Sequence, residues 1–275
     1  MKKIILIAFL HLLSFTLITA QTTLLTEDFE TDGEGSRYNS TAFSDCVNSD
    51  YFLRTNDNAP FSSCGTFGSV LSNVQGSWFW VCEDIESIAN PNATFSMLTL
   101  NPLNVSGYSS ISISLYMATG RTGTQWEQAD TIKIQTSWDG GAYTTIGQFV
   151  GDAEFGGYLR QDTNLDGLAD GGAPDISSTF GNFTFNVPGI GTNLSVRVRL
   201  AGLDGSEEFA FDKITVQGSS APPANYAPIL ASMETVPLVF TEGEPAVNIT
   251  GTITVTDPDD TELDSALVQI CSGFT

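Results

Sequence analysis

Apolar and polar residues alternate one by one along several segments of this chain. In residues 110–115 three large apolar side chains alternate with serines, and the same period of two recurs in residues 132–135 and 194–200. Because successive side chains of an extended strand point to opposite faces, each segment is predicted to be a half-buried strand. Further strands are predicted in residues 94–100, 143–149, 180–187 and 208–216.

Glycine, asparagine and aspartate separate these segments. Trp138-Asp139-Gly140-Gly141 lies between two of them and is typical of a tight hairpin turn. We find no long amphipathic helix pattern after residue 20. About nine or ten strands within about 200 residues predict an all-β fold, with one antiparallel, jelly-roll-like β-sandwich over residues 21–217.

Residues 218–228 read Gly-Ser-Ser-Ala-Pro-Pro-Ala-Asn-Tyr-Ala-Pro. Proline and small residues predict an extended linker with little to bury. Beyond it, Ile249, Ile253 and Val255 alternate with threonines and predict a second β segment over residues 229–275. So short a segment is marginal for a closed sandwich, so we expect an incomplete Ig-like β domain.

The first 20 residues combine Lys2 and Lys3 with a long apolar run and a small-residue end at Ala20. This pattern predicts a bacterial secretory signal peptide that is cleaved after Ala20. The apolar run is short for an anchor, and no later segment approaches the length of a membrane span. We therefore expect a secreted protein, or one held at the cell surface by other means.

The chain is strongly acidic, with 10 Lys+Arg against 32 Asp+Glu and a net charge of −22. Cleavage would remove Lys2 and Lys3, leaving 8 against 32 and a charge of −24. Such a field repels phosphate backbones, so we expect no binding to nucleic acid. The same charges repel one another, and divalent cations would relieve that repulsion.

Side chains for catalysis are scarce. His11 is the single histidine, and signal cleavage would remove it, which excludes Ser-His-Asp and Cys-His arrangements and His-ligated zinc. The segment Glu83-Asp84-Ile85-Glu86 invites comparison with the paired carboxylates of jelly-roll glycosidases. In this chain Val81 stands where the first glutamate of that spacing belongs. We expect a protein without enzymatic activity.

The four cysteines are Cys46, Cys64, Cys82 and Cys271. Export favours disulfides. Cys46 and Cys64 lie in loop-like sequence and are the favoured pair, whereas Cys82 follows an aromatic run and is interpreted as a buried thiol. Spacing alone leaves the connectivity open.

Residues 162–170 read Asp-Thr-Asn-Leu-Asp-Gly-Leu-Ala-Asp. Side-chain oxygens at positions 1, 3, 5 and 9, with glycine at 6, suit a hard cation because alternate residues of a tight turn converge. Ala173 stands at position 12, where an EF-hand loop carries a bidentate acid, so a turn-forming surface loop is the alternative. The predicted calcium ligands are Asp162, Asn164, Asp166, Asp170 and the backbone carbonyl of Leu168.

Two short motifs mark the C-terminal segment. Residues 225–228 read Asn-Tyr-Ala-Pro, and residues 255–259 read Val-Thr-Asp-Pro-Asp. The segment resembles the first half of the cadherin-like repeats of large bacterial surface proteins, which open with an N-x-A-P linker. The resemblance implies calcium ligands at Asp257 and Asp259. The later acidic motifs of these repeats are absent.

The N-terminal domain begins with Glu27-Asp28-Phe29-Glu30 and closes on Phe-Ala-Phe-Asp-Lys-Ile-Thr-Val at residues 209–216. In this it resembles the jelly-roll modules of exported Bacteroidetes-type proteins, and related carbohydrate-binding and MAM-like sandwiches. The resemblance implies that the first and last strands pair with a structural calcium beside them. Its ligands here would be Glu27, Glu30 and Asp212; an acidic edge strand that resists pairing with other chains is the alternative.

The closing segment also changes the phase of its large residues. Phe209 and Phe211 are expected to point to one face of the strand, and Ile214 and Val216 to the other. A β-bulge at residues 212–213 would account for the change, and it would aim Asp212 out of the ladder.

Five aromatic residues could form a platform on which sugars stack. In a sandwich such residues are more often core, and we favour that interpretation. They are Tyr51, Trp78, Trp80, Trp126 and Trp138.

These features together predict an exported, non-catalytic surface protein whose β domains are stabilised by calcium. The expected role is adhesion, with a surface polysaccharide or a protein as ligand. The alternative is a carbohydrate-binding module of a larger secreted enzyme.

Overall fold

A computed structural model describes the chain from residue 21, apart from several short gaps. The described residues are 21–57, 70–87, 89–92, 94–120, 125–154, 156–173, 175–203, 205, 207–220, 228–232, 245, 248 and 251–257. The predicted signal peptide, Cys64, Cys271 and Asp259 lie outside them. The chain divides into two units, residues 1–220 and 221–275, and each is described by itself.

The first unit is built from strands, and the described residues contain no helix, hence none that could cross a membrane. All seven strands predicted from alternation are confirmed. The strands are β1 (Gln21–Glu27), β2 (Tyr38–Ser40), β3 (Phe43–Asp45), β4 (Asp50–Thr55), β5 (Phe79–Glu83), β6 (Ser96–Leu100), β7 (Leu103–Asn104), β8 (Tyr108–Thr119), β9 (Thr131–Trp138), β10 (Thr144–Gly151), β11 (Leu159–Asp162), β12 (Gly181–Asn186), β13 (Asn193–Ala201) and β14 (Phe209–Ser220).

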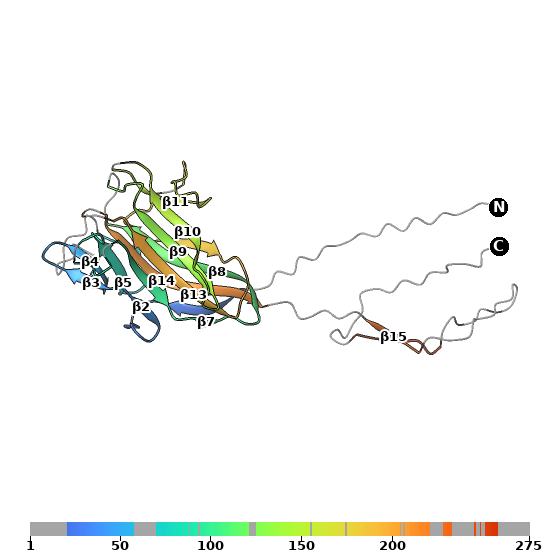
Figure 1. Cartoon of the computed structure of the whole chain (residues 1–275). Coiled ribbons are helices and arrows are strands. Elements are labelled where there is room, and N and C mark those ends of the chain that lie inside the picture. The colour runs from blue at the N-terminus through green and yellow to red at the C-terminus, as the bar shows by residue number, and fades with distance from the viewer. Residues whose placement is uncertain are drawn as a thin grey trace, which may run out of the picture. The chain divides into compact units, whose positions relative to one another are not determined.

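The strands form two antiparallel sheets that face each other (Figure 1). The first, here called sheet A, has the order β12-β8-β14-β5-β4-β3, with β1 also paired to β14. The second, sheet B, has the order β11-β10-β9-β13-β6-β2, with β7 paired to β13. The predicted antiparallel sandwich is confirmed, and so is the pairing of the first and last strands.

The core fills the space between the sheets because one face of each strand is apolar. In β9, Ile132 and Ile134 are fully buried, while Lys133 between them faces the other way. β13 repeats this with Val196 and Val198. The period of two therefore separates an inner apolar face from an outer polar one.

Sheet A also has a covered outer face. β5 is buried along its whole length, because Trp80 and Cys82 face the inner core and Phe79 and Val81 belong to a second apolar cluster. Leu71 and Phe180, from two covering segments, also belong to that cluster. The Ser72 amide donates to the Ser178 carbonyl, and the Phe180 amide donates to the Ser72 carbonyl. Residues 70–78 therefore lie against sheet A and shield the residues beneath them from water.

The hairpin predicted at residues 138–141 is confirmed. It joins β9 to β10, and the Gly141 amide donates to the Trp138 carbonyl over 2.9 Å. Asp139 (φ 51°) and Gly140 (φ 74°) both adopt positive φ, which is the geometry of a type I′ turn.

The predicted linker begins too early. Gly218 and Ser219 pair with Thr22 and Gln21 of β1, and Ser219 also pairs with Ser109 of β8, so β14 continues to Ser220. Small residues suit this position because Gly218 lies close to the side chains of β1 and β8. Composition alone did not reveal the two neighbouring strands.

In the second unit, β15 (Ile229–Ala231) pairs antiparallel with β16 (Thr254–Thr256). β16 confirms part of the alternating segment predicted there. Its exposed apolar side chains, such as Val255 at 42%, are what a β segment with little core would show.

Cys82 is a free, buried thiol, as predicted, and burial raises its pKa. Cys46 takes part in a disulfide. Its predicted partner Cys64 lies outside the described residues, so that pairing stays a prediction.

Candidate functional site

The 162–170 loop leaves the end of edge strand β11 and bends sharply. Asp162 is 1% exposed, and its two carboxylate oxygens accept from the amides of Asp166 (3.3 Å) and Gly167 (2.8 Å). Leu165 (φ 61°) and Gly167 (φ 91°) supply the positive φ of the bend. The predicted turn is therefore present, with Asp162 at its base.

The other predicted ligands of this loop also accept from its backbone. Asn164 accepts from the Asp166 amide, Asp166 from the Leu168 amide, and Asp170 from the amide and hydroxyl of Thr163. The Thr163 bonds lower the pKa of Asp170. The carboxylates of Asp162, Asp166 and Asp170 do not gather within 4.8 Å of one another. The loop is thus held by its own turn bonds, and its calcium site stays a prediction.

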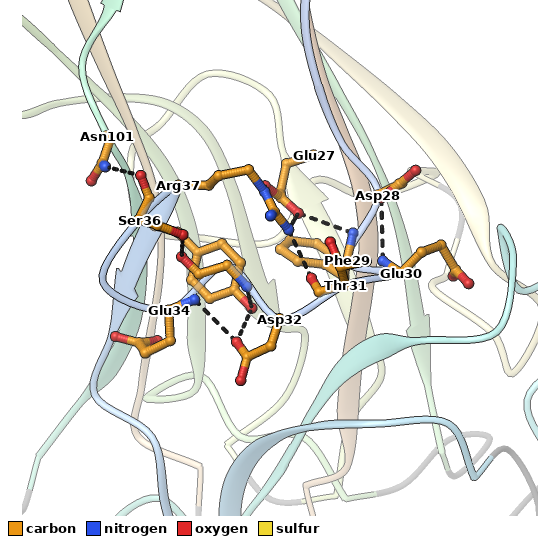
Figure 2. A network of polar contacts seen from close by, with 12 residues as sticks. Glu27, Asp28, Phe29, Glu30, Thr31, Asp32, Glu34, Ser36, Arg37 and Asn101 are labelled. Carbon is orange, nitrogen blue, oxygen red and sulfur yellow. Dashed lines mark hydrogen bonds and ion pairs between the residues drawn. The ribbon is translucent and has the colours of Figure 1, made fainter.

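Glu27 lies apart from the other acids predicted to share its site. It is 2% exposed and forms an ion pair with Arg37, with Arg37 Nε 2.7 Å from Glu27 Oε2. Arg37 Nη2 also donates to Glu27 Oε1 and to the Thr31 carbonyl, and the Phe29 amide donates to Glu27 Oε1 (Figure 2). A carboxylate neutralised in this way is a structural group in this fold; among the described residues, Glu27, Glu30 and Asp212 do not gather within 4.8 Å of one another, and their shared calcium site stays a prediction.

The motif at residues 27–30 differs from the predicted strand in shape as well. β1 ends at Glu27, and Phe29 adopts a positive φ of 59°. Its ring packs edge-on against Tyr38 and Phe211 in the core. The chain therefore leaves the strand at the point where this ring is buried in the core.

Glu30 and Asp212, in contrast, hold the same segment of chain. Glu30 Oε1 accepts from the amides of Ser77 (2.7 Å) and Trp78 (2.9 Å), and Asp212 Oδ2 accepts from the amide of Gln75 (2.8 Å). Gly76 between them has φ +117°, and a Cβ there would lie 2.3 Å from Glu30 Oε1. Glycine is needed because the backbone comes so close to the carboxylate.

Asp212 is the most unusual acid of this region. Its side chain is fully buried, and within the described part of the chain its Oδ1 atom has no hydrogen-bond partner. Burial raises the pKa of Asp212 to about 7, and the charge of Glu30 adds to this effect, whereas the amides of Gln75 and Lys213 and the positive charge of Lys213 oppose it. A buried carboxylate with an unpaired oxygen is costly unless something neutralises it.

The predicted bulge in β14 places this residue. The register against β8 shifts between Asp212 and Thr215, and Lys213 adopts φ 40°. The bulge returns Ile214 to the inner core beside Phe211, so the predicted opposite faces are not observed. Asp212 itself stays in the ladder opposite Tyr116, contrary to the expectation that it would leave it, because the extra residue is Lys213.

Of the two acids implied by the cadherin-like resemblance, Asp257 directly follows β16, as expected for a strand end. Asp259 lies outside the described residues. This pair stays a prediction.

A third group of acids was missed by sequence analysis. Glu127, Asp130 and Glu207 offer carboxylate oxygens that all lie within 4.8 Å of one another. Asp130 and Glu207 are each 1% exposed, and Asp130 Oδ2 accepts from the Glu127 amide over 2.6 Å. Oxygen donors of this kind suit a hard cation. The Glu-x-x-Asp spacing was visible, but only the fold brings Glu207 beside it.

An open cavity of about 440 Å³ lies near the turn after β1. Asp32 accepts there from the Glu34 amide and the Tyr38 hydroxyl, and the amide bond contributes most to its lowered pKa (Figure 2). The Trp80 indole N–H, on a side chain only 3% exposed, has no hydrogen-bond partner among the described residues. The cavity is lined by Asp32, Glu34, Ser40, Ala42, Arg54 and Trp80.

The five aromatic residues do not form a platform, the alternative that was not favoured. Tyr51, Trp80 and Trp126 are buried, which confirms the favoured core interpretation. Trp78 is partly buried beneath the Arg54 guanidinium, and Trp138 donates to the Pro188 carbonyl.

No family model and no curated protein matches the chain. Among solved structures, it is similar to TmCBM61 in complex with beta-1,4-galactotriose, with 12% identity and a TM-score of 0.37 over 69% of this chain and 92% of that chain. It is also similar to the K3 cleaved adhesin domain of Lys-gingipain from Porphyromonas gingivalis w83 (14%, TM-score 0.41, 72% and 99%). A cyclase from Fischerella sp. TAU is similar to the same degree (11%, TM-score 0.40, 74% and 100%). These likenesses concern β-sandwich architecture, which proteins of unrelated activity share.

Proposed function

We propose that this chain is an exported, non-catalytic binding module for adhesion whose sandwich is stabilised by calcium. The observation that carries the calcium part is the fully buried Asp212 carboxylate with its unpaired Oδ1 atom. The absence of histidine after residue 11 supports a non-catalytic role. The acidic charge and the signal-like first 20 residues support export.

A cation beside Glu30 and Asp212 would offset the cost of burying these charges. Ca²⁺ takes six to eight oxygen ligands in flexible geometry, and carboxylates and backbone carbonyls both serve. Asp212 Oδ1 would be the first ligand, with Glu30 as the second acid. Bound calcium would keep residues 75–78 in place against sheet A. The 162–170 loop and Asp257 with Asp259 are further proposed calcium sites.

Thermal unfolding of the full chain tests this proposal. We expect millimolar Ca²⁺ to raise the melting temperature above its value in EDTA, since a ligand at 100-fold its dissociation constant adds about 2.7 kcal/mol to stability. Mg²⁺ at the same concentration is the control, and we expect a smaller effect because it needs stricter geometry. An unchanged melting temperature in Ca²⁺ would refute the calcium proposal.

The cavity beside Trp80 favours a second candidate, a carbohydrate-binding module. Its lining combines two carboxylates, a guanidinium and the edge of a tryptophan, groups that together can bind a sugar. Titration with neutral oligosaccharides should then change tryptophan fluorescence, and Asp32→Asn should weaken the binding. If no neutral oligosaccharide binds, this candidate is ruled out.

A further inference from the structure

The outer face of sheet B concentrates positive charge in a chain that has little of it. Lys133 on β9 and Arg197 and Arg199 on β13 all project from this face, because their neighbours Ile134, Val196 and Val198 face the core. They are three of the 10 Lys+Arg of the whole sequence. We refer to them as the sheet B cations.

The sheet B cations face one another without an acid between them. Lys133 and Arg199 are directly opposite on paired strands, where like charges destabilise a sheet. Within the described residues, none of the three belongs to an ion pair, whereas Arg37 and Arg160 do. In a protein with 32 acidic residues, this arrangement costs stability; Arg197 and Arg199 contact the rings of Tyr143 and Phe95, but none of the three has an acidic partner in the described part of the chain.

The surroundings orient these cations and supply hydrogen-bonding groups. Arg197 stacks over the Tyr143 ring at 3.8 Å, and its Nε donates to Gln135 Oε1 over 2.8 Å. Burial lowers the pKa of Arg197, and repulsion from Arg199 adds to that effect. Gln148 lies opposite Lys133 on β10, so an amide flanks the pair.

This face is also sheltered, as in a shallow binding surface. Gln135 is 9% exposed and Gln148 is 6% exposed, although both lie on the outer side of the sheet. Lys133 on β9 is paired with Gln148 on β10, and Gln148 is paired with Asp162 on β11. Asp162 therefore lies two strands away from Lys133. Its oxygens are bonded to the Asp166 and Gly167 amides.

We propose that the outer face of sheet B binds an acidic polysaccharide, with sugar carboxylates held by Lys133, Arg197 and Arg199. The chain as a whole repels polyanions, but screening by salt limits that repulsion to short range, and the local charge of the sheet B cations then favours an anionic ligand at this face. The partly exposed Tyr143 ring and Thr145 hydroxyl beside Arg197 favour a chain of sugars over an acidic peptide, because a ring can stack on a sugar and a hydroxyl can bond to one. This inference rests on the proposed role as a binding module, and it does not depend on calcium.

Isothermal titration of the full chain with matched trisaccharides tests the inference. Trigalacturonate and galactotriose differ in their carboxylates, and triglutamate carries as many side-chain carboxylates on a peptide as trigalacturonate carries on its sugars. We expect trigalacturonate to bind most tightly, and its affinity to fall with added salt. The double variant Lys133→Gln/Arg199→Gln should lose at least about tenfold in affinity. Lys213→Gln, which removes a cation from sheet A, should change it less than about twofold.

The melting temperature separates loss of binding from loss of fold. Because the double variant removes like-charge repulsion, we expect it to melt no lower than the native chain. Equal binding of galactotriose would leave the binding role intact and overturn the acidic ligand. Tighter binding of triglutamate would replace the polysaccharide by an acidic protein, and binding of none of the three would overturn this inference without affecting the calcium melts.

Discussion

Two acidic regions of this protein differ in what surrounds their oxygens. The 162–170 loop has the spacing of a calcium loop, yet its carboxylates are satisfied by the amides of the same short turn. Glu30 and Asp212 have no telling spacing, since they are far apart in sequence and meet only across residues 75–78. Of the two, the second holds a buried oxygen without a partner.

This difference teaches that two properties of a metal site are separate: the spacing of its ligands in the sequence, and the requirement of a buried carboxylate for a neutralising partner. Spacing brings oxygens near one point, but turn bonds can use the same oxygens. Burial creates the requirement for a partner, because a carboxylate out of water must be protonated, paired or bound to a cation. We therefore expect the stability of the sandwich to depend on calcium through Asp212 more than through Asp162.

The largest effect is expected from Asp212→Asn, which removes the buried charge. In EDTA at pH 8 the variant should be more stable than the native chain by on the order of 3 kcal/mol, because the cost of the buried charge is gone. In Ca²⁺ the native chain should gain stability and the variant should not. Urea unfolding in both conditions measures this. A variant that keeps the full calcium response would remove Asp212 from the site.

The pH dependence of the same residue sharpens the comparison. The pKa of Asp212 is raised from 3.8 to about 7, so between these values the folded state holds a proton that the unfolded state has released. Without calcium, the contribution of this group to stability is present near pH 4 and is lost as pH rises towards 7. The difference between native chain and Asp212→Asn, measured by urea unfolding in EDTA from pH 4 to 8, should grow with pH. A difference independent of pH would contradict the raised pKa.

Glu30→Ala should have the next largest effect. It leaves the Ser77 and Trp78 amides without their acceptor, which should cost about 2 kcal/mol and weaken the calcium response. Asp28→Ala is the matched control, since Asp28 accepts from a single exposed amide, and we expect its effect to be below about 1 kcal/mol. Equal losses in the two variants would show that Glu30 has no special role in holding residues 75–78.

Asp170→Ala should have a smaller effect, confined to its loop. It removes the acceptor of the Thr163 amide and hydroxyl, so the loop should exchange its amide hydrogens faster while the sheets stay protected. The lowered pKa of Asp170 means that its contribution is present above its ordinary pKa and is lost in acid, the opposite sign to Asp212. Global loss of protection would show that the loop supports the whole sandwich.

The smallest effect is expected from Asp166→Asn. An asparagine can still accept from the Leu168 amide, so melting in EDTA should be nearly unchanged. Its calcium response should also be close to that of the native chain. If Asp166→Asn abolished the calcium-dependent rise in melting temperature while Asp212→Asn kept it, the 162–170 loop would be the more important calcium site of the two.

Much of the fold could be predicted because its signals are local. Alternation in residues 132–135 and 194–200 predicts β9 and β13, and Asp139-Gly140 predicts the turn between β9 and β10. The phase change after Phe211 predicts the bulge at Lys213. Short strands such as β7 and β11 were missed, because two to four residues carry no period.

The candidate sites were predicted less well because they depend on contacts between distant segments. The sequence prediction grouped Glu27 with Asp212, but in the fold Glu27 forms an ion pair with Arg37. Glu207 reaches Glu127 and Asp130 from another part of the chain. No spacing in a sequence records which outer-facing residues a covering segment will bury.

By itself, the sequence determined the strand periods, the turn residues and the excess of acid, since each depends on the identity of residues close together. Only the tertiary structure decided that residues 70–78 cover Asp212 and that Lys133 on β9 lies directly opposite Arg199 on the neighbouring strand β13. The reason is physical: burial and register arise from pairing between remote segments, and they decide which charges lack a partner.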